Sequence, residues 1–306
     1  MKMIGQRIIA AILTAALVLT FYPVVAIHAL TEEREASEVK SDANADPSAS
    51  TAGEQISVDN LPFSMTLEEA LEEGYRKRVR EEEENLHSIM LEKANGDRVL
   101  LYYDEPVKYF DDSGEIRDKS SKIIAASKNE YVTASSDIKT VFPTDITKGI
   151  QLSHKNVSVS LKPGDVTRGQ AVLSSDGKNV TYGINENVSY QYSLTAMGFK
   201  EDIIVSRYTG QTEFEFILET NGLTLHNEYG SYVLKDSIGV IKAALGEIII
   251  FTADEMNNTT GIMTAETVKA GEQYMLTIKV DASWLADEKT KYPIVIDPTV
   301  SIKERI

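Results

Sequence analysis

The sequence predicts an all-β protein of antiparallel, sandwich-like sheets, with one helix near the start of its folded part. The main evidence is an alternation of apolar and polar residues with a period of two, the pattern of strands that have one buried face. Strand-like runs recur between residues 86 and 300 at a spacing of roughly 8–15 residues, which is typical of β-sandwiches. Turn sequences containing Gly separate most of these runs.

The clearest strands lie in the stretch Asn185–Leu225. Val188–Ser193 alternates strictly, Glu201–Ser206 is short and β-branched, and Glu213–Glu219 alternates apart from one isoleucine. Glycines stand between these runs, where the chain must turn. We therefore expect three successive strands here, and this stretch is the centre of the predicted sheet structure.

Residues 1–29 have the pattern of a secretory signal peptide. Two basic residues precede the apolar run Ile8–Val25, and small residues suited to cleavage follow at Ala26 and Ala29. The alternative is an uncleaved membrane anchor, because a run of about 18 apolar residues is long enough to span a bilayer. We favour cleavage, and expect a secreted or extracellular protein.

The next segment, residues 30–62, is rich in Glu, Ser, Ala, Asp and Thr and poor in large apolar residues. Such a composition buries too little surface to fold, so a disordered tether is expected. Residues 63–306 then form the β-rich module. Two subdomains, 63–165 and 166–306, are one way to divide it.

The module is expected to begin with a helix. Thr66 and Glu69 form a capping-box pattern. Apolar residues follow at helical spacing as far as Tyr75 and Val79. The acidic run Glu81–Glu84 is interpreted as the solvated end of this helix rather than a metal-binding cluster.

The period then falls to two, and Leu86–Lys93 and Arg98–Asp104 flank an Asn-Gly pair, the strongest short signal for a hairpin. The acidic segment Asp111–Glu115 superficially resembles a calcium-binding loop. It lacks the spacing and the distal glutamate of such a loop, so a hairpin turn is the preferred interpretation.

The remaining strand candidates surround short turns, although Lys122–Lys139 is only weakly patterned. They are Gly149–Ser153 with Val157–Lys162, Ala171–Ser174 with Asn179–Ile184, Leu223–His226 with Tyr232–Leu234, Ile238–Ala244 with Glu247–Thr252, and the closing runs Tyr274–Val280 and Tyr292–Ile296.

Composition excludes several classes of function. The chain has 306 residues and a formal net charge of −16, and such an acidic surface repels nucleic acids and anionic lipids. It contains no Cys, so thiolate metal sites, disulfides and Cys nucleophiles are excluded. Four scattered His residues cannot build a His-rich metal centre. No nucleophile, phosphate-binding or dinucleotide motif is present, so we expect no catalytic, cofactor-binding or metal-binding residues and no cofactor.

Two carbohydrate-related alternatives remain open. Glu213, Glu215 and Glu219 could supply the paired carboxylates of a glycosidase, although the wet face of a strand explains the same alternation. The sole Trp284 could form a sugar-binding platform with Tyr274 and Tyr292, although core packing is preferred because these residues lie at the closing strands.

Three segments together resemble a known family. Arg98–Tyr109 followed by Asp112–Glu115 is similar to its Val-x-Tyr and x-Gly-x-Trp segment, with Ile116 where an aromatic residue is usual. Gly198–Val205 resembles its Lys-Glu-Asp/Asn-Ile-Val segment. Trp284-Leu285 and Tyr292–Thr299 resemble its closing Trp-Leu and Tyr-Pro-Val-x-Ile-Asp-Pro-Thr strand.

This family is the N-terminal β-rich module of large secreted Gram-positive proteins, namely RHS/YD-repeat, wall-associated and DNRLRE-containing proteins. The resemblance covers residues 66–300 and implies a non-catalytic structural or interaction module. It also implies partners in the cell wall or in downstream repeat modules, and often a C-terminal toxin, a pattern from which this sequence departs because it stops at Ile306. A secreted carbohydrate-binding or glycan-hydrolysing sandwich is the alternative.

Overall fold

The computed structural model describes residues 53–57, 60–63, 65–164, 166–254, 258–269 and 272–303. The expected signal peptide and most of the expected tether lie outside these ranges. Contacts divide the chain into two compact units, Met1–Asp118 and Lys119–Ile306, and each is described by itself. The subdomain boundary expected near residue 165 falls within the second unit. No helix in the described ranges is long and apolar enough to cross a membrane.

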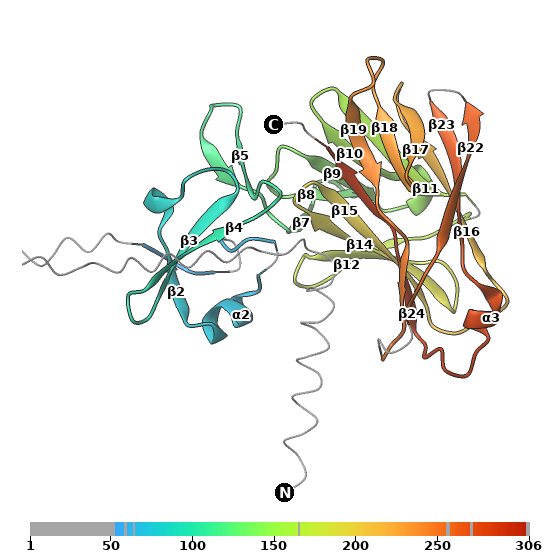
Figure 1. Ribbon diagram of the computed structural model, residues 1–306, viewed down its shortest axis with the longest axis horizontal. Coiled ribbons are helices and arrows are strands. Elements are labelled where there is room, and N and C mark those ends of the chain that lie inside the picture. Colours follow the sequence, from blue (N-terminus) through green and yellow to red (C-terminus); the bar gives the residue numbers. More distant parts are fainter. Residues whose placement is uncertain are drawn as a thin grey trace, which may run out of the picture. The chain divides into compact units, whose positions relative to one another are not determined.

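The first unit contains a four-stranded antiparallel sheet in the order β1-β2-β3-β4 and a separate two-stranded hairpin (Figure 1). Apolar side chains from α2, β2, β3 and β4 form its core, with Val107 just before the hairpin. The elements are β1 (Glu54–Gln55), α2 (Leu67–Glu72), β2 (Tyr75–Arg78), the short 3₁₀ helix η1 (Arg80–Glu82), β3 (Ser88–Lys93), β4 (Arg98–Tyr102), β5 (Lys108–Phe110) and β6 (Ile116–Asp118).

The helix forms as predicted but is much shorter than expected. Thr66 and Glu69 cap it reciprocally, which confirms the capping box. The helix ends at Glu72 because Gly74 has a φ of +88°, a left-handed conformation that stops a helix. Tyr75 and Val79 are buried as expected, but Tyr75 begins strand β2. The prediction that they continue the helix was wrong.

Both predicted turns of the first unit are confirmed. β3 and β4 pair around Asn95-Gly96, and Gly96 has the positive φ that this turn requires. β5 and β6 pair around Asp111–Glu115, where the Asp111 carboxylate accepts hydrogen bonds from the backbone of Ser113 and Glu115. These hydrogen bonds within the segment are those of a hairpin turn, as predicted.

The second unit contains two large sheets in which every strand pairing between described residues is antiparallel. The eight-stranded sheet runs in the order β22 (Ile262–Lys269), β23 (Gln273–Lys279), β16 (Glu213–Glu219), β11 (Val157–Pro163), β10 (Ile150–His154), β9 (Lys139–Pro143), β8 (Glu130–Thr133) and β7 (Ile123–Ala125). The weakly patterned Lys122–Lys139 therefore contains β7, β8 and the start of β9.

The main path of the eleven-stranded sheet runs β12 (Ala171–Leu173), β13 (Asn179–Gly183), β14 (Val188–Thr195), β15 (Gly198–Val205), β25 (Thr299–Ile302), β19 (Ile241–Leu245), β18 (Ser231–Lys235) and β17 (Thr224–Glu228). β24 (Ile294–Asp297) also pairs with β15, and β20 (Ile249–Phe251) joins β24 to β21 (Thr259–Thr260). The short helices are η2 (Ile146–Lys148) and α3 (Ala282–Leu285). β19 and β20 are thus strands, but they do not pair around Gly246 as the sequence suggested.

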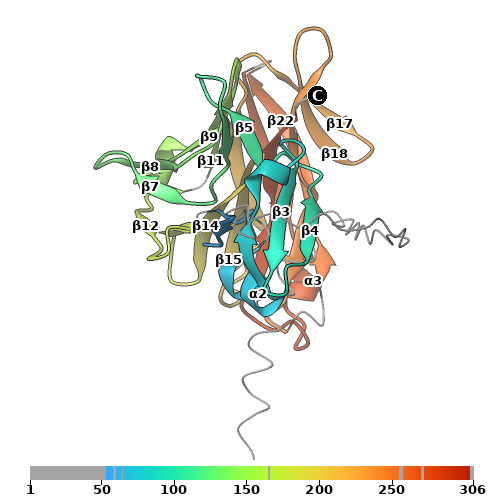
Figure 2. The same ribbon diagram turned by 90° about the vertical axis from the view of Figure 1, so that its left-hand side faces the viewer.

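The two sheets pack through an aromatic interior. Tyr190 on β14 contacts Phe216 on β16, with ring centroids 5.8 Å apart, and Tyr192 contacts Phe142 on β9 at 6.1 Å. All four side chains are buried. β9, β11, β14 and β15 can be followed from a second direction in Figure 2. The all-β, antiparallel, sandwich-like prediction is therefore confirmed, and the central stretch divides between the sheets, with β14 and β15 in one and β16 in the other.

β25 lies between β15 and β19 and joins two halves of its sheet. Its register places Gly198 opposite Ser301 and Leu245 opposite Val300. The backbones at Gly198 are very close, because a Cβ atom placed there would lie 2.2 Å from the carbonyl oxygen of Val300. A residue with any side chain cannot be accommodated without shifting a backbone.

Candidate functional site

The two most specific segments of the family resemblance meet in one charged cluster. Ile203 pairs with Ile296, so the neighbouring Asp202 and Asp297 stand opposite each other on β15 and β24. Lys200 Nζ lies 3.0 Å from Asp202 Oδ1 and 3.3 Å from Asp297 Oδ2. Lys200 and Asp202 therefore form an ion pair, and Asp297, which is distant in the sequence, is a further member of the cluster.

For each of Lys200 and Asp297 in this cluster, burial and the neighbouring opposite charge shift the pKa in opposite directions. Asp297 is 1% exposed, and burial raises its pKa to about 6, against the opposing effect of Lys200. Burial opposes the charged form of Lys200, but the two carboxylates raise its pKa overall. A lysine held as an ammonium ion is neither a nucleophile nor a base. The arrangement ties β15 to β24 through Lys200.

Glu201 points to the opposite face of β15, into the sandwich. It is 0% exposed and accepts a hydrogen bond from the hydroxyl of Tyr192. Burial raises its pKa to about 8, and the negative charges of Asp202 and Asp297 act in the same direction. Sequence reasoning missed this placement, because Glu on a strand usually faces water.

A second charged cluster lies in the first unit. Arg78 is 1% exposed and donates to both carboxylate oxygens of Glu83 and of Asp118. Lys108 Nζ lies 2.8 Å from Glu83 Oε2, and both side chains are buried. Glu83 is therefore the central anion of a buried network, and the prediction that the whole run Glu81–Glu84 is solvated was wrong for this residue.

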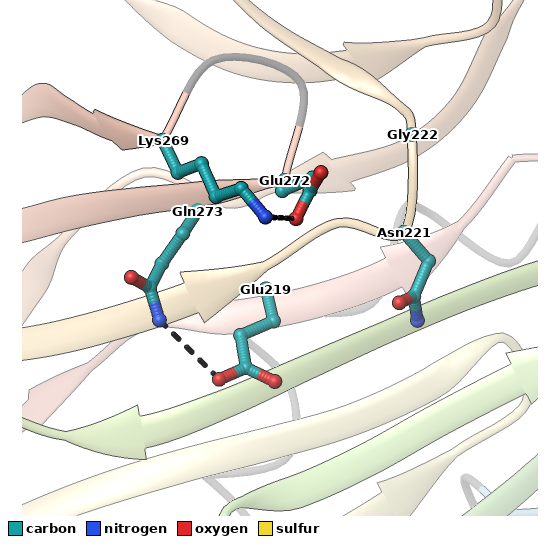
Figure 3. A pocket seen from close by; sticks show the side chains of 6 residues that line it. All are labelled: Glu219, Asn221, Gly222, Lys269, Glu272 and Gln273. Carbon is teal, nitrogen blue, oxygen red and sulfur yellow. Dashed lines mark hydrogen bonds and ion pairs between the residues drawn. The ribbon is translucent and has the colours of Figure 1, made fainter.

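A polar pocket of about 610 Å³ lies where the β22–β23 hairpin approaches the turn after β16 (Figure 3). It is lined by Glu219, Asn221, Gly222, Lys269, Glu272 and Gln273. Gln273 Nε2 donates to Glu219 Oε1 at 3.4 Å, and Lys269 pairs with Glu272. Carboxylate and carboxamide oxygens around an open hollow are groups that can accept hydrogen bonds from a hydroxyl-rich ligand.

The three candidate glycosidase carboxylates do not converge in this pocket. Glu219 lines it, whereas Glu213 forms an ion pair with Lys279 at 2.9 Å and Glu215 lies between them along β16. Apolar residues of the same strand alternate with them and are buried. The wet-face interpretation therefore accounts for their spacing.

The proposed aromatic platform is not assembled either. Tyr274 is buried on β23, and its hydroxyl accepts a hydrogen bond from the backbone of Leu225. Tyr292 donates to the carbonyl of Leu285, and Trp284 is half-buried on α3, which Asp281 caps. Because Tyr274 is in the core, these three rings cannot present one exposed surface.

The described histidines lie apart from one another. His87 contacts the carbonyl of Tyr103, His154 the carbonyl of Asp137, and His226 the hydroxyl of Thr224. His28 lies outside the described residues. Within the described ranges, no group of three or more His, Cys, Asp or Glu side chains is arranged to hold a metal ion.

Comparison with known proteins finds a distant similarity to part of a much longer protein. The chain is 23% identical, over an alignment of 319 residues, to the tRNA nuclease WapA of Bacillus subtilis strain 168 and to the tRNA(Glu)-specific nuclease WapA of Bacillus subtilis subsp. natto. The alignment covers 97% of this chain but only 13% of each relative. No protein-family model matches the sequence, and no solved structure matches the chain.

The similarity supports the coarser part of the predicted resemblance, a relation to one portion of a long WapA-type protein. It extends along nearly all of this chain, so both compact units take part in it. The relatives are named for an activity on tRNA, and the aligned portion is a small fraction of their length.

Proposed function

We propose that this chain is a non-catalytic, secreted or wall-associated structural module that supports or positions other parts of a larger assembly. The observation that carries the proposal is the alignment over 97% of the chain with only 13% of a long WapA protein. The internal pairing of two basic side chains supports it, because Lys200 and Arg78 both pair with carboxylates within the fold. A net charge of −16 also disfavours direct binding of tRNA.

Two assays on the purified full chain test this proposal. We expect it to sediment with purified Gram-positive cell walls and to leave tRNA intact over a long incubation with added divalent cations. An unrelated acidic protein of similar size controls for non-specific sedimentation. Cleavage of tRNA would refute the non-catalytic assignment, and failure to sediment would refute direct wall association.

A second candidate function is glycan binding, and the pocket in Figure 3 is the observation that favours it. We expect Glu219→Gln to weaken binding of soluble cell-wall glycan fragments about tenfold, since a charged acceptor makes a stronger hydrogen bond than a neutral one. Isothermal calorimetry measures the change.

Glu213→Gln is the matched control, because Glu213 lies on the same strand but outside the pocket. It should leave glycan affinity unchanged. Equal affinities for all three proteins would exclude this pocket as the site, and measurable hydrolysis abolished by Glu215→Gln would favour the glycosidase alternative instead.

A further inference from the structure

The buried carboxyl of Glu201 is an unusual feature of the sandwich interior. One oxygen accepts from Tyr192, and the other, Oε2, has no hydrogen-bond partner among the described residues. Leaving a buried polar atom unpaired costs about 1–3 kcal/mol, and more if the group is charged. No lysine or arginine among the described residues pairs with this carboxyl. The nearby Lys200 faces the other side of β15 and is paired with Asp202 and Asp297, and the buried Lys119 is paired with Asp137.

On the interior face of the sheet, the described groups around Glu201 are aromatic rings and hydroxyls. β14 supplies the hydroxyl of Tyr192 and the ring of Tyr190, and Tyr182 on β13 packs edge-on against Tyr192 at 5.7 Å. β9 contacts β15 and directs the buried Thr140 into the same interior, where its hydroxyl also lacks a partner. The other charged groups of β15 and β24, described above, contribute two carboxylates and one lysine.

We propose that Glu201 is a proton-dependent lock of the second unit: the neutral carboxyl lets the two sheets close around Tyr192, and its ionisation favours local opening of β14 and β15. The geometry carries this assignment, because a fully buried, half-satisfied carboxyl with no cation on its face fits the closed sandwich only when it is neutral. The switch acts on the packing between sheets and requires no ligand.

The direction of the pH effect follows from the difference between the pKa of Glu201 in the closed form and in the opened form. The closed form keeps its proton up to a pH of about 8, whereas an opened form exposes an ordinary glutamate with a pKa near 4.5. Stability is therefore greatest at acidic pH and is lost as pH rises between these two values. The pKa of Asp297, raised to about 6, gives the same sign at lower pH. The change in stability between about pH 6 and pH 8 thus reports the ionisation of Glu201.

Hydrogen exchange of the full chain, followed by mass spectrometry, measures the opening of the peptides that contain β14 and β15. In the native protein, the opening equilibrium should rise about tenfold for each pH unit between about 6 and 8. In Glu201→Gln it should stay nearly constant, because the carboxamide keeps an acceptor for Tyr192 and cannot ionise. Comparing the two proteins at the same pH cancels the intrinsic pH dependence of exchange.

Glu215→Gln is the control, since Glu215 is half-exposed on β16, and it should keep the native slope. A flat response in the native protein would overturn the proposal whether or not Glu201→Gln folds. The same slope in both proteins would assign the effect to another group and overturn it equally.

Discussion

Arg78→Ala is expected to unfold the first unit, with a loss of about 3–5 kcal/mol in its unfolding free energy. The substitution leaves Glu83 buried with Lys108 as its remaining cation, and it removes the two donors of Arg78 from Asp118, which keeps Arg80. Removing one member of a buried ion network is costly because the remaining charges lose their partner but stay out of water. Hydrogen exchange of peptides from β2, β3 and β4 measures this loss apart from the second unit.

Arg117→Ala provides the matched control for Arg78→Ala. Arg117 pairs with Asp111 and Glu115 in the same unit, but its side chain is 55% exposed. Pairs of this kind contribute at most about 1 kcal/mol, so protection of the sheet should change little. Equal effects of the two substitutions would contradict the view that burial makes the Arg78 network important.

Gly198→Ala is expected to destabilise the second unit by about 3 kcal/mol or more, near the upper end of overpacking effects. Its added methyl group would meet the carbonyl oxygen of Val300 at 2.2 Å, and this obstacle is backbone rather than a flexible side chain. The strands β15 and β25 must separate to relieve the clash, which breaks the pairing that joins the sheet. Chemical denaturation followed by the fluorescence of Trp284, the only Trp of the chain, measures the effect.

Gly183→Ala is the control for this second prediction. Gly183 ends β13, and a Cβ atom there would have no neighbour within 4 Å. The unfolding free energy of the Gly183→Ala variant should change by less than about 1 kcal/mol, in either direction, since only the conformational freedom of the unfolded chain is altered. A native-like midpoint for Gly198→Ala would show that β25 can shift away from β15 at low cost.

The sequence predicted the strands well, because period-two alternation directly reflects burial on one face. Val188–Ser193 and Glu213–Glu219 both appear as strands near the expected bounds. It could not predict their assignment to sheets, since alternation marks a buried face without identifying what covers it. The predicted helix was too long because Tyr75 and Val79 fit helical spacing as well as burial in a short strand. The positive φ of Gly74 ends the helix before them.

The charged clusters were harder to predict for a different reason. Glu83 stands in a run of four glutamates, and only three-dimensional pairing with Arg78 and Lys108 distinguishes it from its neighbours. Asp297 meets Lys200 through strand register across nearly 100 intervening residues, a separation at which the sequence gives no sign of pairing. The polar pocket likewise depends on two turns that only the fold brings together.

The central position of β25 has a consequence for the order of assembly. During synthesis, β15 and β19 are completed early, but their shared neighbour appears only when residues 299–302 have been made. Until then the larger sheet consists of two parts with unsatisfied edges, each able to pair with the wrong strand. Folding of the second unit is therefore expected to wait until β25 has been made, and to depend more on rapid pairing of β25 with β15 and β19 than on local structure.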